Sequence, residues 1–256
     1  NRNHRKILII DENKVFIGGV NISGKYAKWL DLHVMISGKF LIKKILSSFA
    51  KVYGLAGGND ASIKKYLESG SETRRKKMYN AKVFLIEHWP FRRRSLLKEY
   101  YIEKIDKAEK SIVIVTPYFI PHRWLIALLR KAVARGVLVE VILPIRTDFA
   151  LANVANWIFT EELQDGIRFF FLNEMNHAKV LLIDDKEGMI GSNNIDAMSF
   201  ENNLEAGLIF HNKDMIHGLI KILADWRKSA IPYEQFRIPR PKYYFFVKFC
   251  IDLIQP

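Results

Sequence analysis

An internal repeat restricts the possible folds of this chain more than any other feature of its sequence. Residues near the start reappear 173 positions later: His4, Lys6, Asp11, Gly18 and Asn21 return as His177, Lys179, Asp184, Gly191 and Asn194. Gly19 is matched by Ser192 at the same offset, and Asp31 by Glu205 one position further on. Repetition over this distance predicts two related structural units in one chain.

The spacing within each copy indicates which side chains act together. A His and a Lys two positions apart on a strand face the same side, so both can address one phosphate group. Asp11 and Asp184 stand at odd offsets from these residues and face the other side. We expect these two aspartates to brace the strand and turn through hydrogen bonds.

The remaining repeated positions suit an anion pocket. Gly18 and Gly191, next to Gly19 and Ser192, allow close approach of the backbone, and Asn21 and Asn194 supply amide donors for a phosphate oxygen. Asp31 and Glu205 begin the following strands, where a carboxylate can accept a hydrogen bond from an imidazole Nδ1. Duplication of a purely structural unit is the alternative, but core packing gives no reason to repeat His, Lys and Asn.

The pattern of apolar residues predicts an α/β fold. Between the two motifs, short β-branched runs alternate with amphipathic stretches, which predicts strands at 111–118, 138–143 and 167–172 and helices at 124–134 and 149–163. Around the motifs the same order occurs twice: strands at 6–10, 15–17 and 32–36 with a helix at 40–53, then strands at 180–183, 189–190 and 205–210 with a helix at 215–227.

These elements predict four segments. Residues 1–53 form the end of a first lobe, 54–81 a linker, 82–231 a second lobe and 232–256 a basic, aromatic tail. About 95 residues of the second lobe precede His177, whereas three residues precede His4, so we expect the first lobe to be truncated at its N-terminus. The run Arg74–Lys77 is expected in a solvated loop, and the tail either lies at a membrane interface or packs against the body.

Composition narrows the possible partners. Forty Lys and Arg against 27 Asp and Glu give a formal charge of +13, which favours anionic lipid or nucleic acid without choosing between them. The single cysteine, Cys250, excludes an intrachain disulfide and a cysteine metal cluster. We find no apolar run long enough to span a bilayer. Because the sequence starts without Met, we expect the chain to be a fragment or a processed product.

The two motifs resemble the signature of the phospholipase D superfamily, H-x-K-x4-D followed by Gly-Gly or Gly-Ser and then Asn. Both copies match it in full, through Asn21 and through Asn194. The segments 18–21, 117–121 and 191–205 are similar to those of bacterial cardiolipin synthases. The pattern Asp196-Ala197-Met198-Ser199 resembles a synthase subgroup without membrane-spanning segments.

This resemblance implies duplicated α-β-α sandwich lobes with the active site at their interface. It implies that His4 attacks phosphorus to form a phosphohistidine and that His177 acts as general acid and then base, with no metal or cofactor. The catalytic set would be His4, Lys6, Asp11, His177, Lys179 and Asp184, with the phosphate held or oriented by Asn21, Asn194, Gly18, Gly19, Gly191, Ser192, Asp31 and Glu205.

The expected function is a phosphatidyltransferase that makes cardiolipin from phosphatidylglycerol at the cytoplasmic face of a bacterial inner membrane. Its partners would be an anionic phospholipid and the membrane surface, with nucleic acid less favoured. The alternatives are a metal-independent phosphodiesterase, nuclease or phospholipase D hydrolase, and an inactive membrane-binding fragment. The aromatics Tyr118, Phe119, Trp124 and Trp157 either line a lipid channel or, as we prefer, pack in the core.

Overall fold

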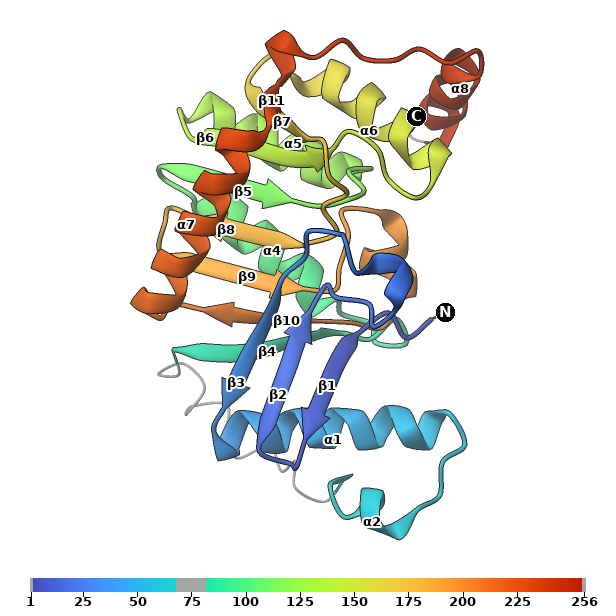
Figure 1. Ribbon diagram of the computed structural model, residues 1–256, viewed down its shortest axis with the longest axis vertical. Helices are drawn as coiled ribbons and strands as arrows, with labels where there is room; N and C mark the ends of the chain where they lie inside the picture. Colours follow the sequence, from blue (N-terminus) through green and yellow to red (C-terminus); the bar gives the residue numbers. More distant parts are fainter. Residues whose placement is uncertain (1, 68–81, 255–256) are drawn as a thin grey trace.

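The computed structural model describes residues 2–67 and 82–254. Its body is an eight-stranded mixed sheet in the order β11-β7-β6-β5-β8-β9-β10-β4 (Figure 1). The strands are β4 (Val83–His88), β5 (Ser111–Val115), β6 (Leu138–Pro144), β7 (Ile167–Leu172), β8 (Val180–Ile183), β9 (Glu187–Gly191), β10 (Glu205–Phe210) and β11 (Ile231–Pro232). β5, β6 and β7 are parallel, and β8 joins β5 in the antiparallel sense.

Helices cover both faces of this sheet. Successive side chains of a strand point to opposite faces, and in the central strands both sets are apolar, so both faces must be buried. On β5, Ile112 and Ile114 pack into one core, whereas Val113 and Val115 pack into another. The first core lies under α4 (Leu96–Lys107), α5 (Arg123–Ala134) and α6 (Ala150–Leu163). The second lies under α7 (Lys213–Ser229). The body is therefore an α-β-α sandwich, which confirms the predicted fold class.

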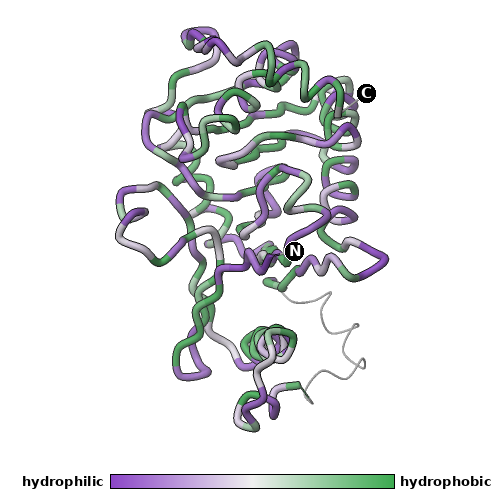
Figure 2. The backbone as a smooth tube through the Cα atoms, turned by 90° about the vertical axis from the view of Figure 1, so that its right-hand side faces the viewer, coloured by the Kyte–Doolittle hydropathy of each residue, from purple (hydrophilic) through white to green (hydrophobic). Residues whose placement is uncertain are grey.

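The N-terminal residues form a smaller lobe below this body. It consists of a three-stranded antiparallel sheet, β1 (Lys6–Ile10), β2 (Lys14–Gly18) and β3 (His33–Ser37), followed by α1 (Lys39–Leu55) and α2 (Ala61–Lys64). Figure 2 shows α1 end-on, with these strands running from the body down beside it. Apolar residues of α1 and β2 pack against Leu85 of β4 and Leu208 of β10, so the two lobes share a core.

The two copies of the motif have the same backbone structure. Ile7 pairs with Ile17 on β1 and β2, and Val180 with Ile190 on β8 and β9, which is the same register 173 residues later. Each pair of strands is joined by a turn with two left-handed residues, Asp11 and Glu12 in one copy and Asp184 and Asp185 in the other. The duplication read from side chains is thus also a duplication of backbone conformation.

The copies differ at one edge. β8 pairs with β5 on one side and β9 on the other, whereas β1 pairs only with β2 among the described residues. Leu8 and Ile10 of β1 are consequently exposed. The first lobe thus lacks, in the described residues, the strand and helix layer that completes the second lobe, as expected from the sequence.

Most predicted elements lie within two or three residues of the observed ones. The pattern missed β4, α4, β11 and the short α2. The helix at the end of the chain is α8 (Tyr244–Ile254), which packs against α6. The division into lobes, linker and tail stays a prediction, and the run Arg74–Lys77 lies outside the described residues. Within the described part, none of the helices has the length and apolar character needed to cross a membrane.

Candidate active site

Both motif histidines lie where the two lobes meet, and each is fixed by backbone hydrogen bonds to the other copy. Leu204 N–H donates to Arg2 O at 2.9 Å, and His4 N–H donates to Leu204 O at 3.0 Å. The equivalent bonds in the other half join Leu30 to Met175 and His177, at 2.9 and 2.7 Å. Each histidine therefore stands beside the start of the other copy's third strand, in a pseudo-twofold arrangement.

This arrangement exchanges the carboxylates between the copies. His4 Nδ1 lies 2.9 Å from Glu205 Oε1, and His177 Nδ1 lies 2.9 Å from Asp31 Oδ2. Since an ionised carboxylate only accepts hydrogen bonds, Nδ1 carries the proton in each neutral imidazole. The lone pair of each Nε2 is then available for chemistry. The sequence predicted a carboxylate on Nδ1, and the structure places it in the opposite lobe from its histidine.

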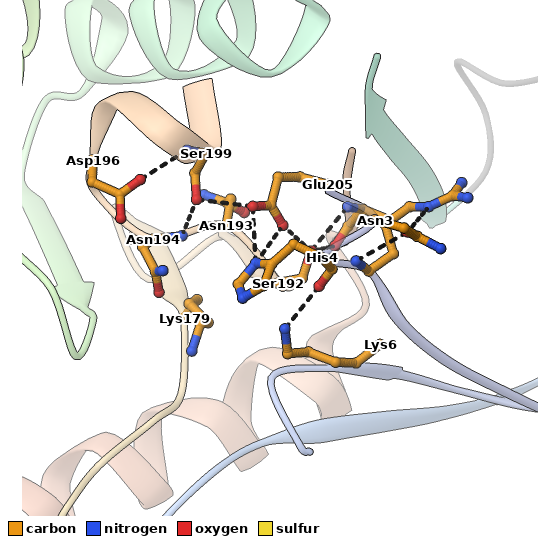
Figure 3. A network of polar contacts seen from close by, with 12 residues as sticks. Asn3, His4, Lys6, Lys179, Ser192, Asn193, Asn194, Asp196, Ser199 and Glu205 are labelled. Carbon is orange, nitrogen blue, oxygen red and sulfur yellow. Dashed lines mark hydrogen bonds and ion pairs between the residues drawn. The ribbon is translucent and has the colours of Figure 1, made fainter. Parts of the chain in front are cut away.

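The two carboxylates are held differently. Glu205 is buried and accepts hydrogen bonds from the hydroxyls of Ser192 and Ser199 (Figure 3). Burial raises its pKa, but the hydrogen bonds from His4 and the two serines outweigh burial and leave the pKa below its usual value. Glu205 is thus an anion that keeps its histidine partner in place.

Asp31 is one methylene shorter than Glu205 and needs different surroundings. Its Oδ1 accepts from Leu32 N–H at 2.7 Å. A Cβ atom at Gly19 would lie 2.2 Å from Asp31 Oδ1 and 2.9 Å from His177 O, so a side chain there would displace the carboxylate. In the second copy the corresponding position is Ser192, whose hydroxyl reaches the longer Glu205. The Gly-Asp and Ser-Glu pairs are two solutions to placing one carboxylate.

The two lysines bring positive charge to the same interface. Lys6 Nζ donates to His4 O at 2.8 Å, and Lys179 Nζ donates to His177 O at 2.5 Å. Burial lowers the pKa of Lys6 to about 8, and burial also lowers the pKa of Lys179, with Lys6 adding repulsion. Burial disfavours the charged form of each lysine, and a bound anion would offset this penalty. The two ammonium groups therefore favour the binding of an anion.

The two histidines differ in exposure. The side chain of His4 is 28% exposed and that of His177 is 6% exposed. Burial lowers the pKa of His177, and the nearby Lys179 and Lys6 act in the same direction, against Asp31. The ring of Trp29 lies 5.4 Å from that of His177, measured between centroids. His177 therefore occupies the drier, more enclosed half of the site.

Asn194 and Asn21 occupy different surroundings. Asn194 is buried beside Lys179, and its Oδ1 has no hydrogen-bond partner within the described residues. Only its Nδ2 group can donate to a phosphate oxygen, because Oδ1 is an acceptor. Asn21 instead lines a separate cleft of about 460 Å³ together with Lys6 and His33. The structure thus places Asn194 beside Lys179 and Asn21 in the cleft that Lys6 also lines.

Asp184 and Asp11 lie away from the histidines. Asp184 accepts hydrogen bonds from the backbone N–H groups of Glu109, Lys110 and Ser111 and so joins the β8–β9 turn to the start of β5. No hydrogen bond to the Asp11 carboxylate occurs in the described residues, where the equivalent of β5 is lacking. Gly18 and Gly191 allow the close approach of the adjacent strand, at Leu32 O and Ala206 O respectively.

Two residues at the site had no role in the sequence prediction. Ser199 Oγ accepts from Asn194 N–H and donates to Glu205 Oε1, at 2.9 Å each. Asp196 accepts from Ser199 N–H at 2.8 Å, and burial raises its pKa. Both belong to the pattern Asp-Ala-Met-Ser quoted for its family resemblance, which was the only signal that could have located them.

Comparisons with known proteins agree with this geometry. Residues 101–226 match the family described as "Cardiolipin synthase, PLD-like domain". The chain is 30% identical over 253 residues to a cardiolipin synthase of Geobacillus kaustophilus, covering 92% of this chain and 48% of that protein. It is 32% identical over 224 residues to a cardiolipin synthase of Clostridium perfringens strain 13, covering 83% and 46%.

Among solved structures, a phosphatidylserine synthase from Haemophilus influenzae Rd KW20 superposes with a TM-score of 0.72 at 16% identity. The match covers 99% of this chain and 70% of that one, which establishes a common fold across both lobes. This chain spans about half the length of the curated relatives that it matches.

Proposed function

Because the chain belongs to the phospholipase D superfamily, with cardiolipin synthases among its relatives, we propose that it transfers phosphatidyl groups between alcohols. The donor is phosphatidylglycerol, the acceptor hydroxyl belongs to a second phosphatidylglycerol, and the products are cardiolipin and glycerol. One observation carries this proposal: two imidazoles, each oriented by the other copy's carboxylate, lie at the same lobe interface as Lys6 and Lys179, whose pKa values burial lowers.

In the first step, Nε2 of His4 attacks phosphorus while the bond to the glycerol oxygen breaks. Glu205 holds Nδ1–H of His4 and stabilises the positive charge that the ring acquires. His177 donates its Nε2 proton to the departing oxygen, so glycerol leaves as a neutral alcohol. The phosphatidyl group remains attached to His4 as a phosphohistidine.

In the second step, His177 takes the proton of the acceptor hydroxyl, whose oxygen attacks phosphorus as the bond to His4 breaks. Lys6, Lys179 and Asn194 hold the phosphate oxygens in both steps. Burial lowers the pKa of His177 in the lipid-free protein. The negative charge of the bound phosphodiester, together with Asp31, favours the protonated ring that the first step requires.

The site works, in this proposal, at a membrane surface, on the cytoplasmic face of a bacterial inner membrane. The formal charge of +13 attracts anionic lipid. The same pocket supports hydrolysis when water replaces the acceptor alcohol, which makes a phospholipase D hydrolase or nuclease the second candidate. An inactive membrane-binding fragment is the third, because among the described residues β1 has no strand beside it that corresponds to β5 beside β8.

The test is the incubation of the purified chain with phosphatidylglycerol vesicles. Cardiolipin and glycerol are the expected products, phosphatidic acid would favour the hydrolase, and cleavage of single-stranded DNA would favour the nuclease. The His177→Ala variant should lower the rate by about 10²–10⁴-fold, the usual contribution of a general acid. His217→Ala, an exposed histidine on α7, is the matched control and should keep the wild-type rate.

A second measurement assigns the roles of the two histidines. Quenching the reaction during turnover of a donor labelled in its phosphate should leave label on the protein, at the peptide that contains His4. Label found on the peptide of His177 would reverse the two roles, and no label with normal product formation would exclude the covalent intermediate.

A further inference from the structure

An apolar cleft of about 700 Å³ lies between α6, α8 and the turn before the helical segment Met198–Asn202. Figure 1 shows α6 and α8 side by side near the β11–β7 edge of the sheet, and the chain ends at α8. The walls of the cleft are mainly hydrocarbon, contributed by Ile120, Ala152, Ala155, Val247 and Ile251. An apolar cleft of this size binds an apolar ligand by excluding water from its walls.

One end of this cleft reaches the candidate active site. Asp196 lines it, and the same carboxylate accepts a hydrogen bond from Ser199, which in turn donates to Glu205 beside His4. Arg2, two positions before His4, also lines the cleft. The cleft therefore adjoins the residues that hold Glu205, on the side of the site where His4 lies.

The other end opens on a surface of exposed hydrocarbon. Phe149, Leu151, Met198 and Phe246 form the rim, and their exposures run from 48% to 68%. Beyond the rim, α8 turns Phe245, Phe249 and Leu253 outward while Tyr244, Val247 and Ile251 pack against the body. Exposed apolar side chains gathered on one face mark a surface that water does not normally cover.

We propose that this cleft holds one acyl chain of the phospholipid substrate, and that the outward face of α8 lies at the boundary between head groups and acyl chains. The inference rests on the proposed function, because it takes a phosphatidyl group as the substrate. It makes α8 part of substrate binding. The helix delivers a lipid from the bilayer to the histidines without the lipid crossing water.

Cys250 provides a direct test, because it lines the cleft and is the only cysteine in the chain. The rate at which a maleimide alkylates Cys250 is measured with monomeric dihexanoyl phosphatidylglycerol and with glycerophosphoglycerol, its counterpart without acyl chains. The His177→Ala variant is used so that turnover of the lipid is slow during the measurement. The acylated compound should slow alkylation about tenfold and the deacylated one should leave it unchanged. Equal effects of both compounds, or none from either, would overturn the proposal.

Vesicle binding tests the outward face of α8. Phe249→Ser should lower the fraction bound to phosphatidylglycerol vesicles several-fold, whereas Phe91→Ser, an equally exposed phenylalanine in the loop after β4, is the matched control. Equal binding by both variants would remove α8 from the membrane contact. Because neither experiment measures turnover, a chain that makes cardiolipin but shows no protection of Cys250 would disprove the cleft assignment alone.

Discussion

At the scale of residues, the site depends on an exchange between the two copies of the motif. Neither His4 nor His177 is oriented by a carboxylate of its own copy, so each copy alone contains half of each histidine-carboxylate pair. The lysines follow the opposite rule, since each donates to the backbone carbonyl of the histidine two positions before it. The histidine pairs thus require both lobes, whereas each lysine is positioned within its own copy.

The lowered pKa of Lys6 predicts a pH dependence of lipid binding. Lys6 is an anion-binding group only when protonated, and its pKa is about 8 in the lipid-free protein. As pH rises through 8 the ammonium loses its proton, so KM for phosphatidylglycerol should rise about tenfold between pH 7 and pH 9. Initial rates measured over a range of lipid concentrations at each pH give this value.

Lys6→Arg is the control for this prediction, because a guanidinium remains protonated across the whole range. In that variant the rise centred on pH 8 should disappear, even if KM itself is higher. An unchanged rise in Lys6→Arg would assign the titration to another group.

At the scale of elements, the two β-hairpins that carry the motifs have the same turn but different neighbours. The β8–β9 turn is fastened to the start of β5 through the Asp184 carboxylate, whose pKa stays below its usual value because these backbone hydrogen bonds outweigh partial burial. The β1–β2 turn has no such strand beside it among the described residues. One repeated aspartate thus stabilises its hairpin by a contact that the other lacks.

This difference predicts unequal costs for the same substitution. Asp11→Ala and Asp184→Ala both place alanine at a φ near +50°, so the strain of the left-handed backbone is common to both. Asp184→Ala also removes the acceptor of three N–H groups and should lower the free energy of unfolding by about 2 kcal/mol more than Asp11→Ala. Urea denaturation of both variants measures the difference, and equal values would show that Asp184 does not brace the sheet.

At the scale of the whole molecule, the small lobe is attached through a shared core and a buried ion pair. Arg5 Nη1 lies 3.0 Å from Glu87 Oε1 on β4 and donates to Ser48 of α1 at 2.6 Å. The Arg5 guanidinium also lies 5.2 Å from the centroid of Trp89. The variable position between His4 and Lys6 is therefore used to fasten the first motif to the second lobe.

Removing this link should destabilise the chain strongly. The side chains of Arg5 and Glu87 are 4% and 17% exposed, so Arg5→Ala leaves a largely buried carboxylate unpaired, at a cost of about 3 kcal/mol. Arg94→Ala breaks the exposed pair with Glu99, where 78% and 41% of the side chains are accessible, and should cost less than about 1 kcal/mol. Chemical denaturation compares the two variants, and a small effect at Arg5 would mean that the shared apolar core alone attaches the lobe.

The sequence alone determined the repeat, the α/β class and the histidines, lysines and carboxylates that meet between the lobes. These follow from local rules: the period of a strand sets which side chains share a face, and identical spacing produces identical hairpins, down to the left-handed turns at Asp11 and Asp184. α4 was missed because its apolar pattern is weak. β4 is a short apolar run that is defined by its pairing with β10, which is distant in sequence.

Only the tertiary structure decided which carboxylate serves which histidine, which repeated aspartate has a partner, and where an apolar cleft meets the site. Each of these depends on how the lobes and α8 dock, and residues such as His4 and Glu205 lie 201 positions apart. Spacing along a chain fixes the direction of a side chain within its own element. The group that it meets is set by the packing of elements against one another, which the local pattern does not encode.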